Sequence, residues 1–171
     1  MAIAFVADYV SSFTPLLPGI PFLWVTFMFY PCFVLWFKSW GLLALWLEGG
    51  ITGPFFGQPY PWSFVASFSS ALFVLSPILF KASKTDISLK RWRDVAVAIV
   101  VNMGIIAALQ TVYYNLALVP LGWYTLDWAL SWTGFLTTYA VGLPMIAFHL
   151  LLLRTLSPYI KRSPLYVKGW I

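Results

Sequence analysis

Polar and small residues recur on one face of the last long apolar segment, residues 127–153. At about 100° of rotation per residue they fall within a stripe of roughly 80°. Its members are Asp127, Ser131, Gly134, Thr138, Gly142, Met145 and His149. A sparser stripe on the preceding segment contains Asn102, Ile106, Gln110 and Tyr113. Polar groups on an apolar helix turn away from lipid, so both stripes are expected to face the interior of a helical bundle.

Hydrogen-bonding and aromatic residues gather near one end of these two stripes. The candidate ligand-binding residues are Gln110, Tyr113, Asn115, Trp123, Tyr124, Asp127, Trp128 and Ser131. A few polar groups among aromatic walls can bind a small, partly aromatic or cationic ligand, and Asp127 favours a cation. The alternative is an interfacial aromatic belt with polar contacts between helices.

Three further polar residues, Glu48, Asn102 and His149, stand inside apolar segments. An ionisable side chain within a membrane span is a functional candidate, because its charged form needs a partner or water there. Glu48 immediately precedes Gly49-Gly50, and a break at these glycines would instead let it reach solvent or cap a neighbour. A proton- or ion-conducting role for Glu48 and His149 is a further hypothesis.

His149 is the only histidine, and the only cysteine, Cys32, is far from it in sequence. We therefore predict that His149 is packed as a neutral side chain with one hydrogen bond, rather than ligating a metal. Cys32 is expected to be a buried, unreactive thiol.

Catalytic motifs are absent from the sequence. It has no glycine-rich phosphate loop, no GxSxG and no HExxH, and its five acidic residues are scattered. Paired acid–base chemistry is therefore not expected. We predict that the protein is not an enzyme and uses no cofactor or metal.

The composition is typical of an integral membrane protein. The chain is 61% hydrophobic and 9% charged, and its mean hydropathy is +0.87, which leaves too little polar surface for a soluble domain. We predict one transmembrane domain, residues 1–171, with an all-α fold. This would be a polytopic bundle of about six helices, or about five if Ala2–Thr14 lies at the membrane interface.

The loop Lys81–Arg93 orients the predicted bundle. It holds five of the ten basic residues, and lysine and arginine in short loops collect on the cytoplasmic side. The predicted spans are 20–37, 40–57, 62–80, 94–119 and 127–153. This topology puts the loop and the C-terminus in the cytoplasm of a cell-membrane protein. The net charge of +5 is thereby explained without nucleic-acid binding.

Small residues recur every four positions in two neighbouring segments, as Gly49-x3-Gly53-x3-Gly57 and Ser63-x3-Ser67-x3-Ala71. Such spacing places small side chains on one helix face and favours close helix packing in a membrane. Pro54 interrupts the first motif, so a turn at the end of that span is the alternative.

The order of segments has a further pattern. A short first segment is followed by a proline-bearing link, Pro15–Phe22, an apolar second span and a glycine-rich third, Trp40–Pro54. This layout resembles the substrate-capture S-components of energy-coupling-factor (ECF) transporters. The resemblance implies six membrane helices, an outer-face pocket for a vitamin or related compound, and partners comprising a transmembrane scaffold and two ATPases.

We therefore expect a membrane-embedded small-molecule-binding protein, the substrate-capture subunit of an uptake transporter. Its expected partners are the lipid bilayer, other membrane subunits and a small-molecule ligand. The alternative is a structural or accessory transmembrane subunit of a larger membrane complex, in which aromatic surface and small-residue faces contact other subunits.

Overall fold

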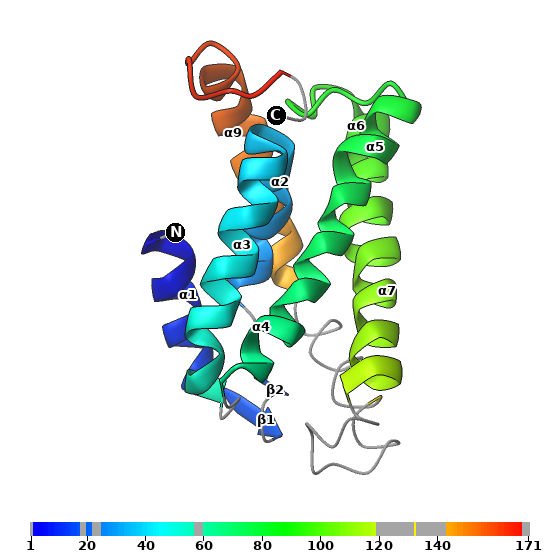
Figure 1. The fold of residues 1–171 in the computed structure, drawn as a ribbon. Helices are drawn as coiled ribbons and strands as arrows, with labels where there is room; N and C mark the ends of the chain where they lie inside the picture. The colour runs from blue at the N-terminus through cyan, green and yellow to red at the C-terminus, as the bar shows by residue number, and fades with distance from the viewer. Residues whose placement is uncertain are drawn as a thin grey trace.

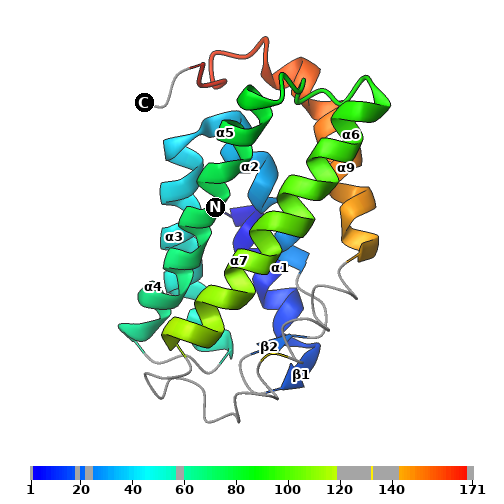
Figure 2. The ribbon, with the colours of Figure 1, turned by 90° about the vertical axis from the view of Figure 1, so that its right-hand side faces the viewer.

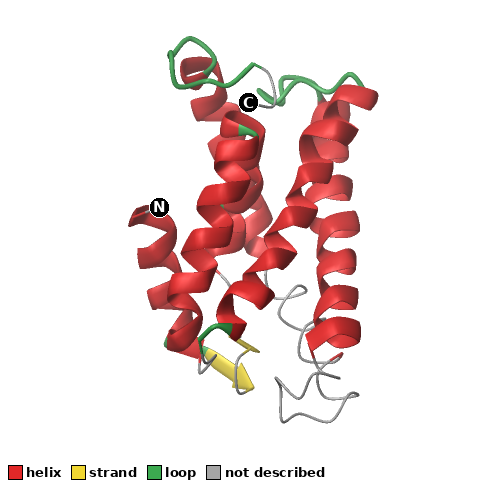
Figure 3. Cartoon of the chain, viewed as in Figure 1, coloured by secondary structure: helices red, strands yellow, loops and turns green. Residues whose placement is uncertain are grey.

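The computed structural model of the chain describes residues 2–17, 20–21, 25–56, 60–118, 132 and 143–168. Over these ranges the chain forms a bundle of helices whose axes run between two ends (Figure 1). One end carries the loop 83–91 and the segment after the last helix, and we call it the basic end. The other, the opposite end, carries two short strands (Figure 3). The helical bundle agrees with the predicted all-α fold, to which the strand pair is an addition.

The N-terminal helix α1 (Ala2–Ser12) is followed by β1 (Pro15–Leu17), which pairs antiparallel with β2 (Ile20–Pro21). At 1.5 Å per residue, its 11 residues extend about 16 Å, half of a bilayer's hydrocarbon thickness. The helix therefore cannot cross a membrane alone. It packs against α3 in the half of the bundle nearer the opposite end (Figure 1).

A tight helical hairpin follows. It comprises η1 (Val25–Met28), α2 (Tyr30–Phe37), α3 (Ser39–Thr52) and η2 (Gly53–Phe56). Lys38 makes the turn between α2 and α3 with a φ of 52°. Gly41 lets the two helices approach closely, because a Cβ there would lie 2.5 Å from the Phe33 carbonyl oxygen. The hairpin lies over the predicted spans 20–37 and 40–57, whose crossing of a membrane stays a prediction.

Two longer helical runs are apolar and long enough to cross a membrane, Trp62–Ala82 and Trp92–Leu116. The first comprises α4 (Trp62–Ser67), η3 (Phe68–Val74) and α5 (Leu75–Ala82). The second lies within α6 (Trp92–Ala98), η4 (Ile99–Ile105), α7 (Ile106–Tyr113) and η5 (Tyr114–Leu118). They run side by side in Figure 2 and match the predicted spans 62–80 and 94–119. The last helix, α9 (Leu143–Ile160), includes the end of the predicted span 127–153.

The two small-residue motifs pack against each other. A Cβ on Gly49 of α3 would lie 2.8 Å from the Ser67 Cβ of α4. Ser63 Oγ also donates a hydrogen bond to the Gly50 carbonyl oxygen at 2.7 Å. The predicted close packing is thus present between α3 and α4, because neither glycine has a side chain to separate the helices.

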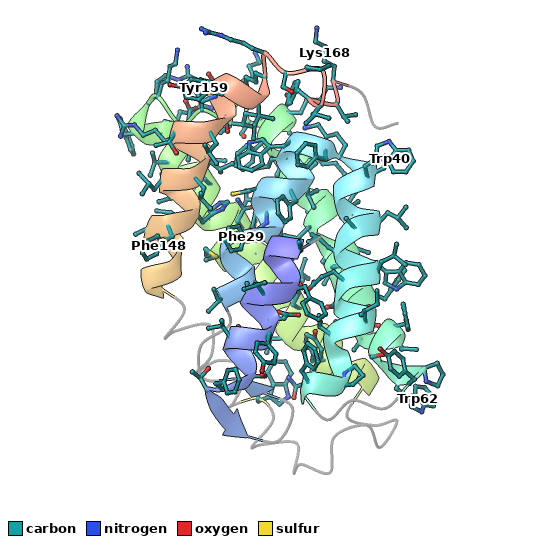
Figure 4. All side chains as sticks on the ribbon, turned by 90° about the vertical axis from the view of Figure 1, so that its left-hand side faces the viewer. Phe29, Trp40, Trp62, Phe148, Tyr159 and Lys168 are labelled. Carbon is teal, nitrogen blue, oxygen red and sulfur yellow. The ribbon has the colours of Figure 1, made fainter. Side chains whose placement is uncertain are left out.

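The bundle is apolar outside and contains many polar groups inside. On the run from α6 to η5, Val100, Leu109, Val112 and Leu116 are exposed, whereas Asn102, Gln110, Thr111 and Asn115 are buried. On α1, Val6, Tyr9, Val10 and Phe13 are exposed, whereas Asp8 and Ser11 are buried. Figure 4 shows Trp40 and Trp62 projecting from the bundle at different heights. On these two segments apolar side chains face outwards and polar side chains face inwards, an arrangement that lipid rather than water favours.

Candidate functional site

Two acidic side chains, Asp8 of α1 and Glu48 of α3, lie together in the bundle interior. Each is only 2% exposed, and Asp8 is close enough to act electrostatically on Glu48. In apolar surroundings two neighbouring carboxylates repel each other, so their charge must be balanced by a proton or by a cation.

Hydroxyl groups from three other parts of the hairpin surround this pair. Thr26 of η1 donates to Asp8 Oδ1, and Thr52, at the end of α3, donates to Asp8 Oδ2 at 2.6 Å. Tyr30 of α2 donates to Glu48 Oε2 at 2.7 Å. We call these five residues the acidic core.

One carboxyl oxygen of the acidic core can accept a further hydrogen bond. Glu48 Oε1 is buried and receives no hydrogen bond from an N–H or hydroxyl group of the residues that the structure describes. An additional proton or a cationic group would satisfy this oxygen, because a carboxylate accepts hydrogen bonds and attracts positive charge.

A second buried hydrogen-bonded chain, which we call the histidine chain, joins α5, η4, α9 and α2. Ser76 Oγ donates to Asn102 Oδ1, which leaves the Asn102 Nδ2 group to donate to His149 Nε2 at 3.0 Å. His149 Nε2 is therefore an acceptor, and the Nδ1 proton points at Cys32 Sγ, 3.2 Å away. Cys32 Sγ in turn lies 3.9 Å from the His149 carbonyl oxygen. With the donors in this order, each ring nitrogen of a neutral His149 has a hydrogen-bond partner.

These observations correct one sequence prediction, for His149, and remove one of the alternatives for Glu48. His149 uses both ring nitrogens rather than forming one hydrogen bond, because packing of α2 against α9 brings Cys32 to it across 117 residues of sequence. Glu48 does not reach solvent, because α3 continues through Gly49-Gly50 without a break. Cys32 is buried, as expected.

The predicted ligand pocket is described only on its α7–η5 side. Trp123, Tyr124, Asp127, Trp128 and Ser131 lie outside the described residues. Gln110 and Asn115 are buried, and the Tyr113 hydroxyl donates to the Val65 carbonyl oxygen at 2.7 Å. Asn115 Nδ2 donates to the Thr111 carbonyl oxygen at 2.8 Å, whereas its Oδ1 accepts no hydrogen bond from the described part of the chain.

Tyr114 connects this side of the bundle to the acidic core. Its hydroxyl accepts a hydrogen bond from Ser69 Oγ at 3.1 Å, and it lies within electrostatic range of Asp8 and Tyr30. Through Ser69, the Tyr114 hydroxyl joins η5 to η3 in the bundle interior.

Asp8 is the functional candidate that sequence reasoning missed. It interrupts a short apolar segment, and Ser11 lies three residues further on, so both side chains fall on the same helix face. Two polar residues on one face of an otherwise apolar helix predict a polar contact inside the bundle. This pattern does not identify the partner of Asp8, because Glu48 lies 40 residues further along the chain.

Comparisons of the chain with protein-family models, with curated proteins and with solved structures find no match. The resemblance to ECF S-components stays a prediction.

Proposed function

We propose that this chain is a membrane-embedded small-molecule-binding protein, the substrate-capture subunit of an uptake transporter, and that its ligand is a cation. The observation that carries the proposal is the acidic core. It contains two buried carboxyl groups and three hydroxyl groups, contributed by α1, η1, α2 and α3.

Membrane insertion is supported by where polar side chains lie. Val100, Leu109 and Val112 face outwards from a helical run whose Asn102 and Gln110 are buried. Lipid favours this arrangement, since it solvates apolar side chains and leaves polar groups to partner one another. The two helical runs that are long and apolar enough to cross a membrane are consistent with membrane insertion.

Orientation is supported by the basic residues. Lys38 follows α2, the loop Lys81–Arg93 lies between α5 and α6, and Lys161 and Lys168 follow α9. The turn after α2, the loop between α5 and α6 and the segment after α9 all lie at the basic end (Figure 1), where Figure 4 shows Lys168. The positive-inside tendency therefore favours a cytoplasmic basic end in the cell membrane, with the acidic core nearer the outer face.

The chemistry of the core favours a positively charged ligand. A carboxyl pair buried in a bilayer is neutralised by a proton, and an amine that enters the site can replace that proton. Glu48 Oε1 offers an unused acceptor, and Asn115 Oδ1 offers a second one in the same half of the bundle. Because the sequence has no nucleotide-binding motif, uptake would require the scaffold and ATPase partners of such a transporter.

A second candidate function is that of an accessory subunit in a larger membrane complex. The observation that favours it is an apolar groove of about 430 Å³ near the basic end, lined by Phe33, Phe37, Trp40, Gly41, Ala44, Pro164, Leu165 and Val167. An apolar groove of this kind suits a helix of another subunit.

Ligand binding by the purified full chain tests the first candidate. Native mass spectrometry would identify any retained small molecule, and thermal unfolding in detergent would be followed with a panel of amines and matched neutral and acidic compounds. We expect selected amines to stabilise the wild type but neither Glu48→Gln nor Asp8→Asn. The control Asp86→Asn removes a carboxyl group at the basic end and should keep the response.

An equal response of the wild type, Glu48→Gln and Asp8→Asn would contradict the proposed cation site. Co-purification with subunits of a complex unrelated to transport would favour the accessory role instead.

A further inference from the structure

A pocket of about 800 Å³ opens at the basic end between α2, α5 and the segment after α9. Its charged walls are Lys38, Lys81 and Lys168, and Leu35, Pro77 and Ile78 are among its apolar walls. We call it the lysine pocket. It is separate from the acidic core, which lies towards the other end of the bundle.

Among the residues that the structure describes, none that lines the lysine pocket carries a carboxyl group. The nearby acids are engaged elsewhere: Asp86 pairs with Lys161, and Asp94 accepts two hydrogen bonds from Arg91, each 3.0 Å long. Three ammonium groups that share a pocket without a carboxylate repel one another and attract an anion.

Lys38 is held in place at the pocket wall. Its Nζ donates to the Leu35 carbonyl oxygen at 2.5 Å and lies 5.7 Å from the centre of the Tyr166 ring. Burial, with a smaller contribution from the charge of Lys161, lowers the pKa of Lys38. An ammonium group in this position gains from a bound anion, which would offset both effects.

The apolar walls narrow the choice of anion. Ile78 of α5 lines the pocket and is 45% exposed, so the pocket wall continues onto the apolar outer surface of the bundle. Hydrocarbon attached to the anion could lie along this surface while the charged group meets the lysines. Anionic groups at the cytoplasmic face of a membrane are mainly lipid phosphates.

We propose that the lysine pocket binds a phosphate group, held by Lys38, Lys81 and Lys168 at the basic end. The source favoured by the apolar wall is an anionic phospholipid, and the other source of the same chemistry is a soluble phosphate compound. The site requires no ligand at the acidic core, so its test does not depend on the proposed transport function.

The test uses the purified full chain in neutral detergent and three probes: phosphatidylglycerol, phosphatidylcholine and inorganic phosphate. Retained lipid is counted by native mass spectrometry, and phosphate binding by calorimetry. The pocket variant combines Lys38→Gln, Lys81→Gln and Lys168→Gln. A charge-matched control combines Lys90→Gln, Arg154→Gln and Arg162→Gln, three exposed positions that do not line the pocket.

We expect phosphatidylglycerol to bind the wild type in preference to phosphatidylcholine. The pocket variant should lose at least about tenfold in affinity for it, and the control less than about threefold, since the control removes the same charge at positions that do not line the pocket. A selective loss of inorganic phosphate binding instead would support the same site with a soluble ligand.

Equal losses in the two triple variants would show general attraction between charges and overturn the proposal. So would unchanged binding of both phosphate probes by the pocket variant. If the triple variant does not fold, Lys81→Gln compared with Lys90→Gln gives the same contrast. The Lys81 change should then weaken binding selectively, and equal affinities would count against the site.

Discussion

The Thr52 hydroxyl donates a 2.6 Å hydrogen bond to Asp8 Oδ2, which joins the end of α3 to the middle of the N-terminal helix. Thr26 donates to the other oxygen of the same carboxyl group. Three segments are thereby attached at one buried acidic side chain. Because α1 is too short to cross a bilayer alone, these polar contacts are important in holding it to the bundle.

Replacing Thr52 with valine tests this attachment. The change keeps the shape of the side chain but removes one donor to a buried carboxyl group. We expect the free energy of unfolding to fall by about 1–3 kcal/mol, the usual cost of a lost hydrogen bond to a buried charged or polar group. Denaturant unfolding in mixed micelles measures it. Thr155→Val, at an exposed threonine that bonds within its own helix, should change stability by less than about 0.5 kcal/mol.

The histidine chain predicts a defined tautomer for His149. Since Asn102 Nδ2 faces Nε2 at 3.0 Å, the ring proton should reside on Nδ1. Nitrogen-15 NMR of histidine-labelled protein in detergent distinguishes the two tautomers, and His149 is the only histidine. In Ser76→Ala the amide of Asn102 is no longer oriented by the serine hydroxyl, so a mixture of tautomers is expected. A wild-type ring protonated at Nε2 would contradict the assigned direction of the chain.

Two glycine-to-alanine changes should have opposite effects. A Cβ at Gly41 would lie 2.5 Å from the Phe33 backbone oxygen, whereas a Cβ at Gly104 would meet nothing within 4 Å. Gly41→Ala is expected to destabilise the α2–α3 hairpin by about 1–3 kcal/mol, because backbone must shift. Gly104→Ala should be neutral or stabilising by up to about 1 kcal/mol, because alanine favours helix. Unfolding of both variants under one set of conditions checks this contrast, and equal effects would count against the packing described here.

The ion pair of Asp86 and Lys161 should stabilise the basic end in a pH-dependent way. Burial opposes ionisation of Asp86, but hydrogen bonds from Lys161 and Ser88 outweigh it and hold its pKa below the ordinary value of 3.8. The unfolded chain therefore binds a proton more readily at this residue. The stabilisation is fully present above about pH 4 and is lost as the pH falls through the lower folded-state pKa.

Asp86→Asn should accordingly reduce stability at pH 7, by no more than about 1 kcal/mol because the side chain is 38% exposed and solvent screens the pair. The difference from wild type should shrink below pH 4. Lys161→Gln should give the same pattern, measured by unfolding at several pH values. A difference that is as large at pH 3 as at pH 7 would exclude the ion pair as its cause.

Local sequence is enough to predict which faces of the helices are polar. The stripe through Asn102 and Gln110 predicts burial, and both residues are buried. The small-residue spacing at Gly49 and Ser67 predicts close helix packing, which α3 and α4 form. These features follow from the 3.6-residue period of a helix, so they can be derived from local sequence alone.

Which polar faces meet could not be predicted from local sequence, because it depends on how the helices pack. Asp8 lies beside Glu48, 40 residues later, and Cys32 lies 3.2 Å from His149, 117 residues later. The lysine pocket likewise combines Lys38, Lys81 and Lys168 from three separate segments. Periodicity shows that a side chain points inwards, but its neighbour depends on which helices pack together and at what relative height. Helix pairing depends on the shapes of all the contacting helices together, so no single stretch of the sequence encodes it.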